Sequence, residues 1–194
     1  AGAGGDMRGD QPTSQDLELD WRIQRGRRTI DTSRILHDMG KPVIGMINGP
    51  VAGAGIGLAG ACDIRFAAES ATFTPAFDKR GYSGDYGACY LWTKIIGSGR
   101  TRQLFMLGDQ LNAQQSLDYG LFTKVFPDAE LKDRTYELAR RMAANYPSCW
   151  RLMKSSLNAA EDSSLETAFD FEVNNMVMSM QLVRERIAAQ QAAE

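Results

Sequence analysis

A run of glycine and alanine, GPVAGAGIGLAGA at 49–61, limits the fold more than any other feature of the chain. The segment before it, VIGMIN (43–48), and the segment after it, CDIRFAAE (62–69), both have the pattern of buried strands. Between Gly55 and the strand at 62–69 there is room for only about two helical turns, whereas a full crossover helix takes about ten or more residues. We therefore expect a very short helix between these two strands.

The same run contains Gly55, Gly57 and Gly60 in the GxGxxG pattern that is typical of dinucleotide-binding proteins. The short connection disfavours that function, and Asp78, which has the spacing of the usual ribose-binding acid, lies in a predicted loop. No Gly-Lys-Ser/Thr follows, which excludes a Walker loop. Two interpretations remain open. The run is either a backbone oxyanion site, in which small residues let a ligand approach a helix N-terminus, or a helix packed tightly on a sheet.

The remaining sequence alternates strands and helices and then becomes helical. Lys41-Pro42 ends a helix predicted from Leu17 to Met39, because a residue before proline avoids the α region. Further strands are predicted at 72–77 and 122–126, and further helices at 86–96, 100–107, 112–120 and from 127 to about 145. After Pro147 an apolar stripe marks a helical tail: Leu152, Leu157, Leu165, Phe169, Val173 and Met176. The pattern predicts an α/β core over 1–146 and a C-terminal helical region over 147–194.

Charge and cysteine usage restrict the setting. With 194 residues and a formal net charge of -2, the chain has no need of a nucleic-acid or membrane partner. Cys62, Cys89 and Cys149 form no CxxC pair, which favours a reducing compartment without zinc. Because the chain also starts without a signal-peptide pattern, we expect a cytoplasmic protein. It begins with a glycine-rich loop and no element ahead of it, so we also expect further N-terminal residues.

Three segments together resemble one known family. KPVIGMINGPVAGAGIGLAGACDIRFAAESATF (41–73) resembles the signature of the crotonase superfamily, the enoyl-CoA hydratase/isomerase family. Ala3-Gly4-Gly5-Asp6 resembles the family's Ala-Gly-x-Asp hallmark, and GDQLNAQQSLDYGLFTKVFPDAEL (108–131) resembles the region before its helical tail. The segments follow the family's order and span nearly the entire chain.

The resemblance implies a crotonase-like spiral of β-β-α repeats with a C-terminal helical region that mediates trimers or dimers of trimers. It implies acyl-CoA thioesters as substrates, with coenzyme A carried by the substrate and no separate cofactor or metal. The oxyanion donors would be the backbone N–H groups of Gly5 and Ala54. The substrate-binding residues would be Ala3, Gly4, Asp6, Met7, Gly53, Phe77 and Tyr82.

Two departures from the family's pattern bear on the reaction. Hydratases of the two-glutamate kind carry carboxylates at the positions of Gly57 and Phe77, so a hydration step that uses such a pair is disfavoured here. Asp85 lines up instead with an aspartate of dienoyl-CoA isomerases, 1,2-epoxyphenylacetyl-CoA isomerases and 4-chlorobenzoyl-CoA dehalogenases. The loop AFDKRGYSGDYG is most similar to the epoxyphenylacetyl-CoA isomerase type. The dehalogenases use a histidine at the position of Ile30, whereas the one histidine, His37, comes seven residues later.

Several interpretations of Asp85 stay open at this stage. As a catalytic group, Asp85 would carry a proton between two carbons of an enoyl-CoA, which makes isomerisation the favoured reaction. Hydration of a 2-enoyl-CoA and acyl-CoA binding without catalysis are the alternatives. Because Asp85 directly precedes the helix predicted at 86–96, it is also a candidate for that helix's N-cap.

Overall fold

Two small sheets form the framework of the computed structural model, which describes residues 19–192. The first sheet is parallel, in the order β1 (Ile44–Ile47), β3 (Ile64–Ala68), β6 (Lys124–Phe126). The second has the order β2 (Val51–Ala52), β4 (Thr72–Thr74), β5 (Leu111–Asn112), with β5 antiparallel to β4. The strand predicted over 72–77 ends early, at Thr74, because Pro75 has no N–H to donate to a ladder.

Helices make up most of the remaining described chain. They are α1 (Leu19–Asp38), α2 (Ala54–Gly60), the 3₁₀ turn η2 (Asp78–Arg80), α3 (Ala88–Ile96), α4 (Ser98–Leu107), α5 (Ala113–Tyr119), α6 (Leu131–Ala143), α7 (Pro147–Ala160) and α8 (Leu165–Gln191). The limits of α5 follow from local chemistry. Asn112 and Gln115 form a reciprocal capping box at its start, and Gly120, with φ 84°, ends it. Both predicted boundaries of this helix are confirmed.

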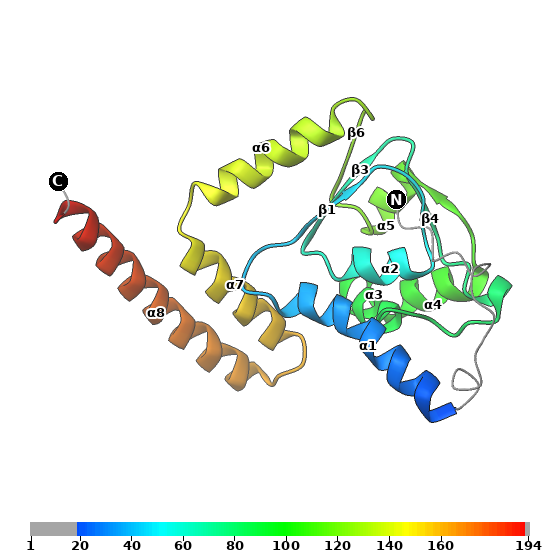
Figure 1. Ribbon diagram of the computed structural model, residues 1–194, viewed down its shortest axis with the longest axis horizontal. Coiled ribbons are helices and arrows are strands. Elements are labelled where there is room, and N and C mark those ends of the chain that lie inside the picture. The colour runs from blue at the N-terminus through cyan, green and yellow to red at the C-terminus, as the bar shows by residue number, and fades with distance from the viewer. Residues whose placement is uncertain (1–18, 193–194) are drawn as a thin grey trace. The chain divides into compact units, whose positions relative to one another are not determined.

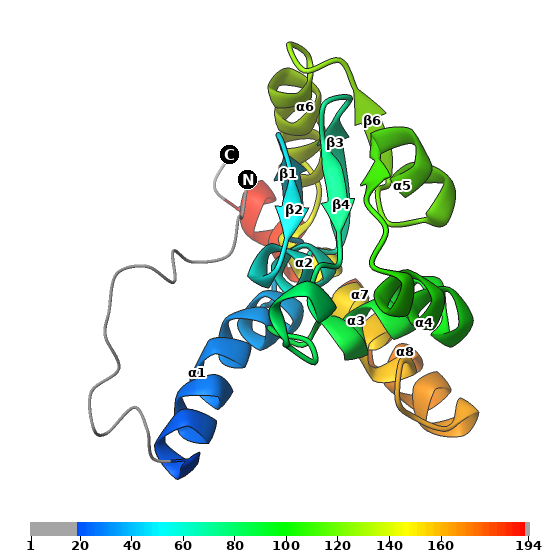
Figure 2. The same cartoon turned by 90° about the vertical axis from the view of Figure 1, so that its right-hand side faces the viewer.

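The chain winds between the two sheets as a spiral. After β1 in the first sheet it enters β2 in the second, continues through α2, and returns to β3 beside β1 (Figure 1 and Figure 2). Ile44 of β1 pairs with Ile64 of β3, and Val51 of β2 pairs with Phe73 of β4, so the same order repeats in the next turn. The described chain therefore has the spiral of β-β-α repeats, followed by a helical region, that the resemblance implies.

The core lies between the sheets and the short helices that follow them. Phe73 and Trp92 meet edge to face, with ring centroids 5.1 Å apart. The Trp92 indole N–H donates to the carbonyl oxygen of Ile56 at 2.9 Å, which ties α3 to α2. Figure 2 shows α2 and α3 close to each other at one end of the strands. Trp92 is fully buried, so it belongs to the core.

Arg65 of β3 is a charged residue inside this core, with 7% of its surface exposed. Its Nε donates to the carbonyl oxygen of Leu121 at 2.8 Å, and its Nη1 donates to those of Ala59, at 3.4 Å, and Cys62. The guanidinium carbon lies 5.5 Å from the centroid of the Trp92 ring. The side chain therefore holds the end of α2 against β3 and the segment that leads into β6.

The chain forms two compact units, one that includes residues 43–135 and one that combines residues 38–42 with the chain from Tyr136 onward. In the second unit α7 and α8 pack together, and the Asn175 side-chain amide donates to the Leu152 carbonyl at 3.3 Å and to Ser156 Oγ at 3.0 Å. Leu152 is buried, whereas α8 exposes many large apolar side chains: Leu165, Phe169, Phe171, Val173, Met176, Val177, Met178 and Met180. Between residues 19 and 192, no helix has both the length and the apolar character that crossing a bilayer requires.

We expect Arg65→Met to lower the free energy of unfolding by about 2–4 kcal/mol, because methionine fills similar volume but leaves buried carbonyl oxygens without their donor. Arg100→Met is the matched control. Arg100 also contacts a carbonyl, that of Tyr119 at 3.2 Å, and lies over the Tyr119 ring, but it is exposed. Its loss should change stability by less than about 0.5 kcal/mol. Urea unfolding followed by circular dichroism measures both, and equal midpoints would contradict the assigned role of Arg65.

Candidate active site

The turn between β2 and α2 presents a backbone N–H group at the start of α2. Gly53, with φ 54° and ψ -127°, is the N-cap of α2, and side-chain-bearing residues rarely adopt this conformation. Its carbonyl accepts a hydrogen bond from the Ile56 N–H at 3.0 Å. Among residues 19–192 no carbonyl accepts from the N–H of Ala54, the first residue of α2. This donor is at the position where the resemblance expects an oxyanion contact.

A positively charged side chain contacts the C-terminal end of α2. The Arg65 guanidinium binds the carbonyl oxygen of Ala59 in the last turn, where the helix carries partial negative charge. Burial lowers the pKa of Arg65, while the nearby Cys62 and Asp63 act in the opposite direction. An arginine remains protonated at physiological pH despite such a shift, so a permanent positive charge lies at the end of α2 that is remote from Ala54.

Asp85 lies in the loop between η2 and α3, and this loop bends sharply. Gly84, Tyr86 and Gly87 have φ values of 130°, 49° and 74°, and Tyr86 is the one non-glycine residue with positive φ in the described chain. The exposed Asp85 side chain accepts a hydrogen bond from the Tyr86 N–H at its Oδ1 (2.8 Å). Its backbone carbonyl accepts from the Ala88 N–H at 2.9 Å. The N-cap of α3 is Gly87, without a side-chain cap, so the interpretation of Asp85 as the N-cap is wrong.

A close contact between Gly57 of α2 and Tyr86 of this loop joins the loop to the helix. A Cβ added to Gly57 would lie 2.4 Å from Tyr86 Cβ and 2.5 Å from the Tyr86 carbonyl oxygen. The two backbones therefore touch at a position where no side chain fits. Gly57 is one helical turn from Ala54 and Tyr86 is next to Asp85, so this contact connects the two elements that carry the predicted catalytic groups. The sequence analysis includes Gly57 in the GxGxxG pattern and as the place of an absent glutamate, but not as a site residue, although that glycine pattern is the signal for a close backbone approach.

The other predicted site residues differ in their positions. Phe77 is buried, with its ring centroid 5.7 Å from that of Phe105, and belongs to the core. Tyr82 is 48% exposed, and its N–H donates to the Phe77 carbonyl at 2.9 Å. Gly53 lies in the turn before α2. The predicted residues Ala3, Gly4, Gly5, Asp6 and Met7 lie outside the described residues.

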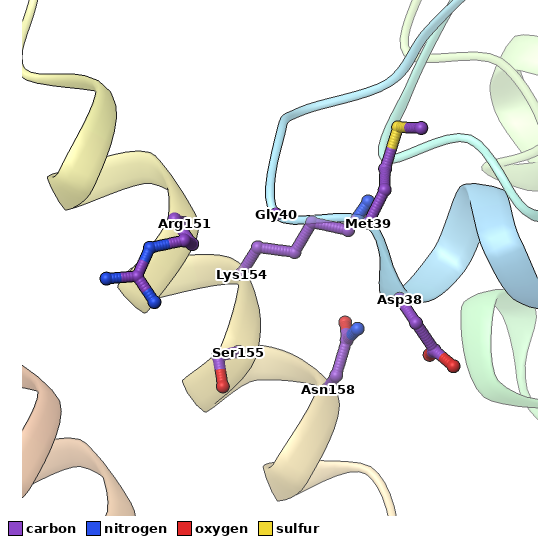
Figure 3. A pocket seen from close by; sticks show the side chains of 7 residues that line it. All are labelled: Asp38, Met39, Gly40, Arg151, Lys154, Ser155 and Asn158. Atoms are coloured by element: carbon purple, nitrogen blue, oxygen red, sulfur yellow. The ribbon is translucent and has the colours of Figure 1, made fainter.

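A hollow of about 400 Å³ lies elsewhere, in the second unit (Figure 3). Its lining residues are Asp38, Met39, Gly40, Arg151, Lys154, Ser155 and Asn158. Lys154 is buried, and its Nζ lies 3.4 Å from the Lys41 carbonyl oxygen, which it binds. None of the predicted site residues lines this hollow. The described part of the chain has no group of three or more His, Cys, Asp or Glu side chains placed to hold a metal.

Comparison with known proteins agrees with the fold and with the motifs. The enoyl-CoA hydratase/isomerase family model matches residues 6–191. The chain is 37% identical over 172 residues to a 1,2-epoxyphenylacetyl-CoA isomerase from Escherichia coli (strain K12), covering 88% of this chain and 65% of the relative. It is 30% identical over 140 residues to 4-chlorobenzoyl coenzyme A dehalogenase-1 from Arthrobacter sp, covering 72% of this chain and 51% of that relative.

Solved structures lead to the same class. The crystal structure of an enoyl-CoA hydratase/isomerase from Cupriavidus metallidurans CH34 superposes with a TM-score of 0.82 at 28% identity, covering 85% of this chain and 62% of that chain. The chain belongs to the enoyl-CoA hydratase/isomerase family, as its sequence motifs predict. It spans between about half and two thirds of the length of the two curated relatives it matches.

Proposed function

We propose that this protein moves a double bond within an unsaturated acyl-CoA thioester by proton transfer through an enolate. The N–H groups of Gly5 and Ala54 polarise the thioester carbonyl and hold the negative charge on its oxygen as the enolate forms. The Asp85 carboxylate removes a proton from C2 of a 3-enoyl-CoA. The resulting carboxylic acid returns a proton to C4, which gives the 2-enoyl-CoA and regenerates the carboxylate.

The contact between Gly57 and Tyr86 carries this proposal. In a two-glutamate hydratase one carboxylate would be at position 57, and here the Tyr86 backbone fills that space. The second would be at position 77, where Phe77 lies in the core. Asp85, by contrast, is exposed beside Tyr86, and only one of its oxygens has a hydrogen-bond donor in the described chain. The positions that would activate water carry no carboxylate, while the adjoining loop presents one.

The relatives support the choice of substrate class. One carries the name of an isomerase and another that of a dehalogenase, and both names specify a coenzyme A thioester. The acyl-CoA thioester therefore remains the proposed substrate, with coenzyme A as part of it and no separate cofactor. The cytoplasm remains the proposed location, without a nucleic-acid or membrane partner.

The choice between isomerisation and hydration is tested with two substrates. When a 3-enoyl-CoA is added to the purified protein, the absorbance of the conjugated thioester should rise as the double bond moves to C2. Crotonyl-CoA, which is already conjugated, should keep its absorbance. A fall in crotonyl-CoA absorbance would show that water is added, and hydration would replace isomerisation as the proposed function.

The role of Asp85 is tested by Asp85→Asn, which keeps the side chain's size and its acceptor for the Tyr86 N–H. We expect kcat on the 3-enoyl-CoA to fall by about 10²–10⁴, with KM changed little, because asparagine cannot carry the proton. Asp78→Asn, in the same exposed segment, is the matched control and should leave kcat unchanged. Full activity of Asp85→Asn would remove this residue from the mechanism. Acyl-CoA binding without turnover in the unmodified protein would favour the non-catalytic alternative.

We also propose that the protein assembles as a trimer or a dimer of trimers through α8. The exposed apolar residues on this helix, among them Leu165, Phe169, Val173 and Met176, support an assembly, because monomeric proteins rarely expose large contiguous apolar patches. Light scattering after size-exclusion chromatography should give three or six times the mass of one chain. Phe169→Glu together with Met176→Glu should reduce that mass, whereas a monomeric unmodified protein at micromolar concentration contradicts the assembly.

A further inference from the structure

We propose that Gly57 is a positioning residue, because its lack of a side chain lets the backbone of Tyr86 lie directly on α2 and thereby sets the position of Asp85. This inference rests on the proposed function of Asp85. It adds a role for Gly57 that is separate from the absence of a glutamate there.

The contact leaves no room for even one added carbon. A Cβ at position 57 would lie 2.4, 2.5 and 2.8 Å from Cβ, the carbonyl oxygen and the carbonyl carbon of Tyr86. Real Cβ contacts under 3.0 Å essentially do not occur, so one of the partners would have to move. These atoms belong to the backbone or are bonded directly to it, so a change of rotamer cannot relieve the contact. The 85–87 segment itself would have to shift away from α2.

The conformation of Tyr86 shows that its surroundings impose this position. A bulky residue at φ 49° is unfavourable, and such conformations persist only where the surrounding structure determines them. Two interactions do so here: the contact with Gly57 on one side, and the hydrogen bond from the Tyr86 N–H to Asp85 Oδ1 on the other. Gly84 and Gly87, both with positive φ, let the chain enter and leave this bend.

Asp85 cannot move independently of this contact. Its side chain accepts a hydrogen bond from the Tyr86 N–H, and its backbone carbonyl accepts one from the Ala88 N–H at the start of α3. A displacement of Tyr86 by about 1 Å therefore displaces the carboxylate by a similar amount, and a misplacement of this size can reduce a rate by about 10²-fold. Gly57→Glu should therefore not give the protein hydratase activity, because the glutamate would push away the loop that carries Asp85.

The test uses Gly57→Ala, Tyr86→Gly and the double variant. We expect Gly57→Ala to lower kcat on a 3-enoyl-CoA at least 10-fold with KM changed less than 3-fold. Adding Tyr86→Gly should restore kcat at least 5-fold over Gly57→Ala. Glycine removes the opposing Cβ, and its wider range of φ and ψ lets the carbonyl group, whose oxygen and carbon would lie 2.5 and 2.8 Å from the added Cβ, turn away. The proposal is overturned if the fold-loss of kcat in the double variant equals the product of the fold-losses in the two single variants. An unchanged kcat for Gly57→Ala also overturns it.

Two glycine controls separate positioning from general destabilisation. A Cβ on Gly60 would meet Leu91 Cβ at 3.1 Å and Trp92 Nε1 at 3.3 Å, so Gly60→Ala disturbs the packing of α2 on α3 without touching the loop. It should lower the urea midpoint and keep kcat within 3-fold. Gly99→Ala, with open space around the added carbon, should change neither the urea midpoint nor kcat. A loss of kcat in Gly60→Ala as large as that in Gly57→Ala would make the effect one of stability and would overturn the positioning role.

A readout independent of catalysis separates this inference from the proposed function. Cys89 is exposed, its thiol donates to the Ser83 carbonyl at 3.7 Å, and its alkylation can be followed by mass spectrometry of the peptide. Gly57→Ala should raise that alkylation rate several-fold as the loop leaves α2. If Asp85→Asn is fully active, the proposed function fails, while the alkylation rate still tests the contact. A raised rate with normal kcat shows that the contact does not position Asp85 and overturns the inference.

If Gly57→Ala does not give folded protein, the bend at Tyr86 that places Asp85 is tested from the loop side. Asparagine tolerates positive φ far better than the β-branched valine does. Tyr86→Asn should therefore retain a kcat at least 5-fold higher than that of Tyr86→Val. Equal kcat values for the two variants would overturn the proposal.

Discussion

The Arg65 guanidinium lies inside the core, where a charge is tolerated only if polar groups replace the water it has lost. Carbonyl oxygens from the end of α2 and from the segment leading into β6 supply those groups, and the face of the Trp92 ring lies nearby. The loss of any one of these partners would leave a buried charge poorly compensated. The arrangement therefore joins α2, β3 and α3 into one unit, and the proposed site is built on the opposite end of α2.

The site depends equally on the absence of side chains. Gly53 takes a backbone conformation that other residues rarely adopt, so that the chain can turn from β2 into α2. Gly57 then leaves space that the Tyr86 backbone fills. Glycine within a helix is usually destabilising relative to alanine, by roughly 0.5–1 kcal/mol. At position 57 that disadvantage is offset by a close contact between two backbones, and the strained Tyr86 is held in place by the same contact.

Family membership and reaction rest on different parts of the molecule. The fold as a whole is what this chain shares with a solved member of the family. The proposed chemistry depends on a few positions placed on that fold, namely which loop supplies a carboxylate and which positions near α2 cannot hold one. Relatives with the names of an isomerase and a dehalogenase illustrate how one framework supports several reactions of coenzyme A thioesters.

The family, the order of the elements and the capped helix at Asn112 could be predicted from the sequence, because each depends on a motif or on residues near one another in the chain. The tertiary structure decided the rest. It made Gly87, and not Asp85, the N-cap of α3, it placed Phe77 in the core, and it buried the charge of Arg65. It also brought Gly57 against Tyr86. Contacts of this kind join segments that are distant in sequence, so their geometry depends on how sheets and helices pack, and local patterns of residues do not specify it.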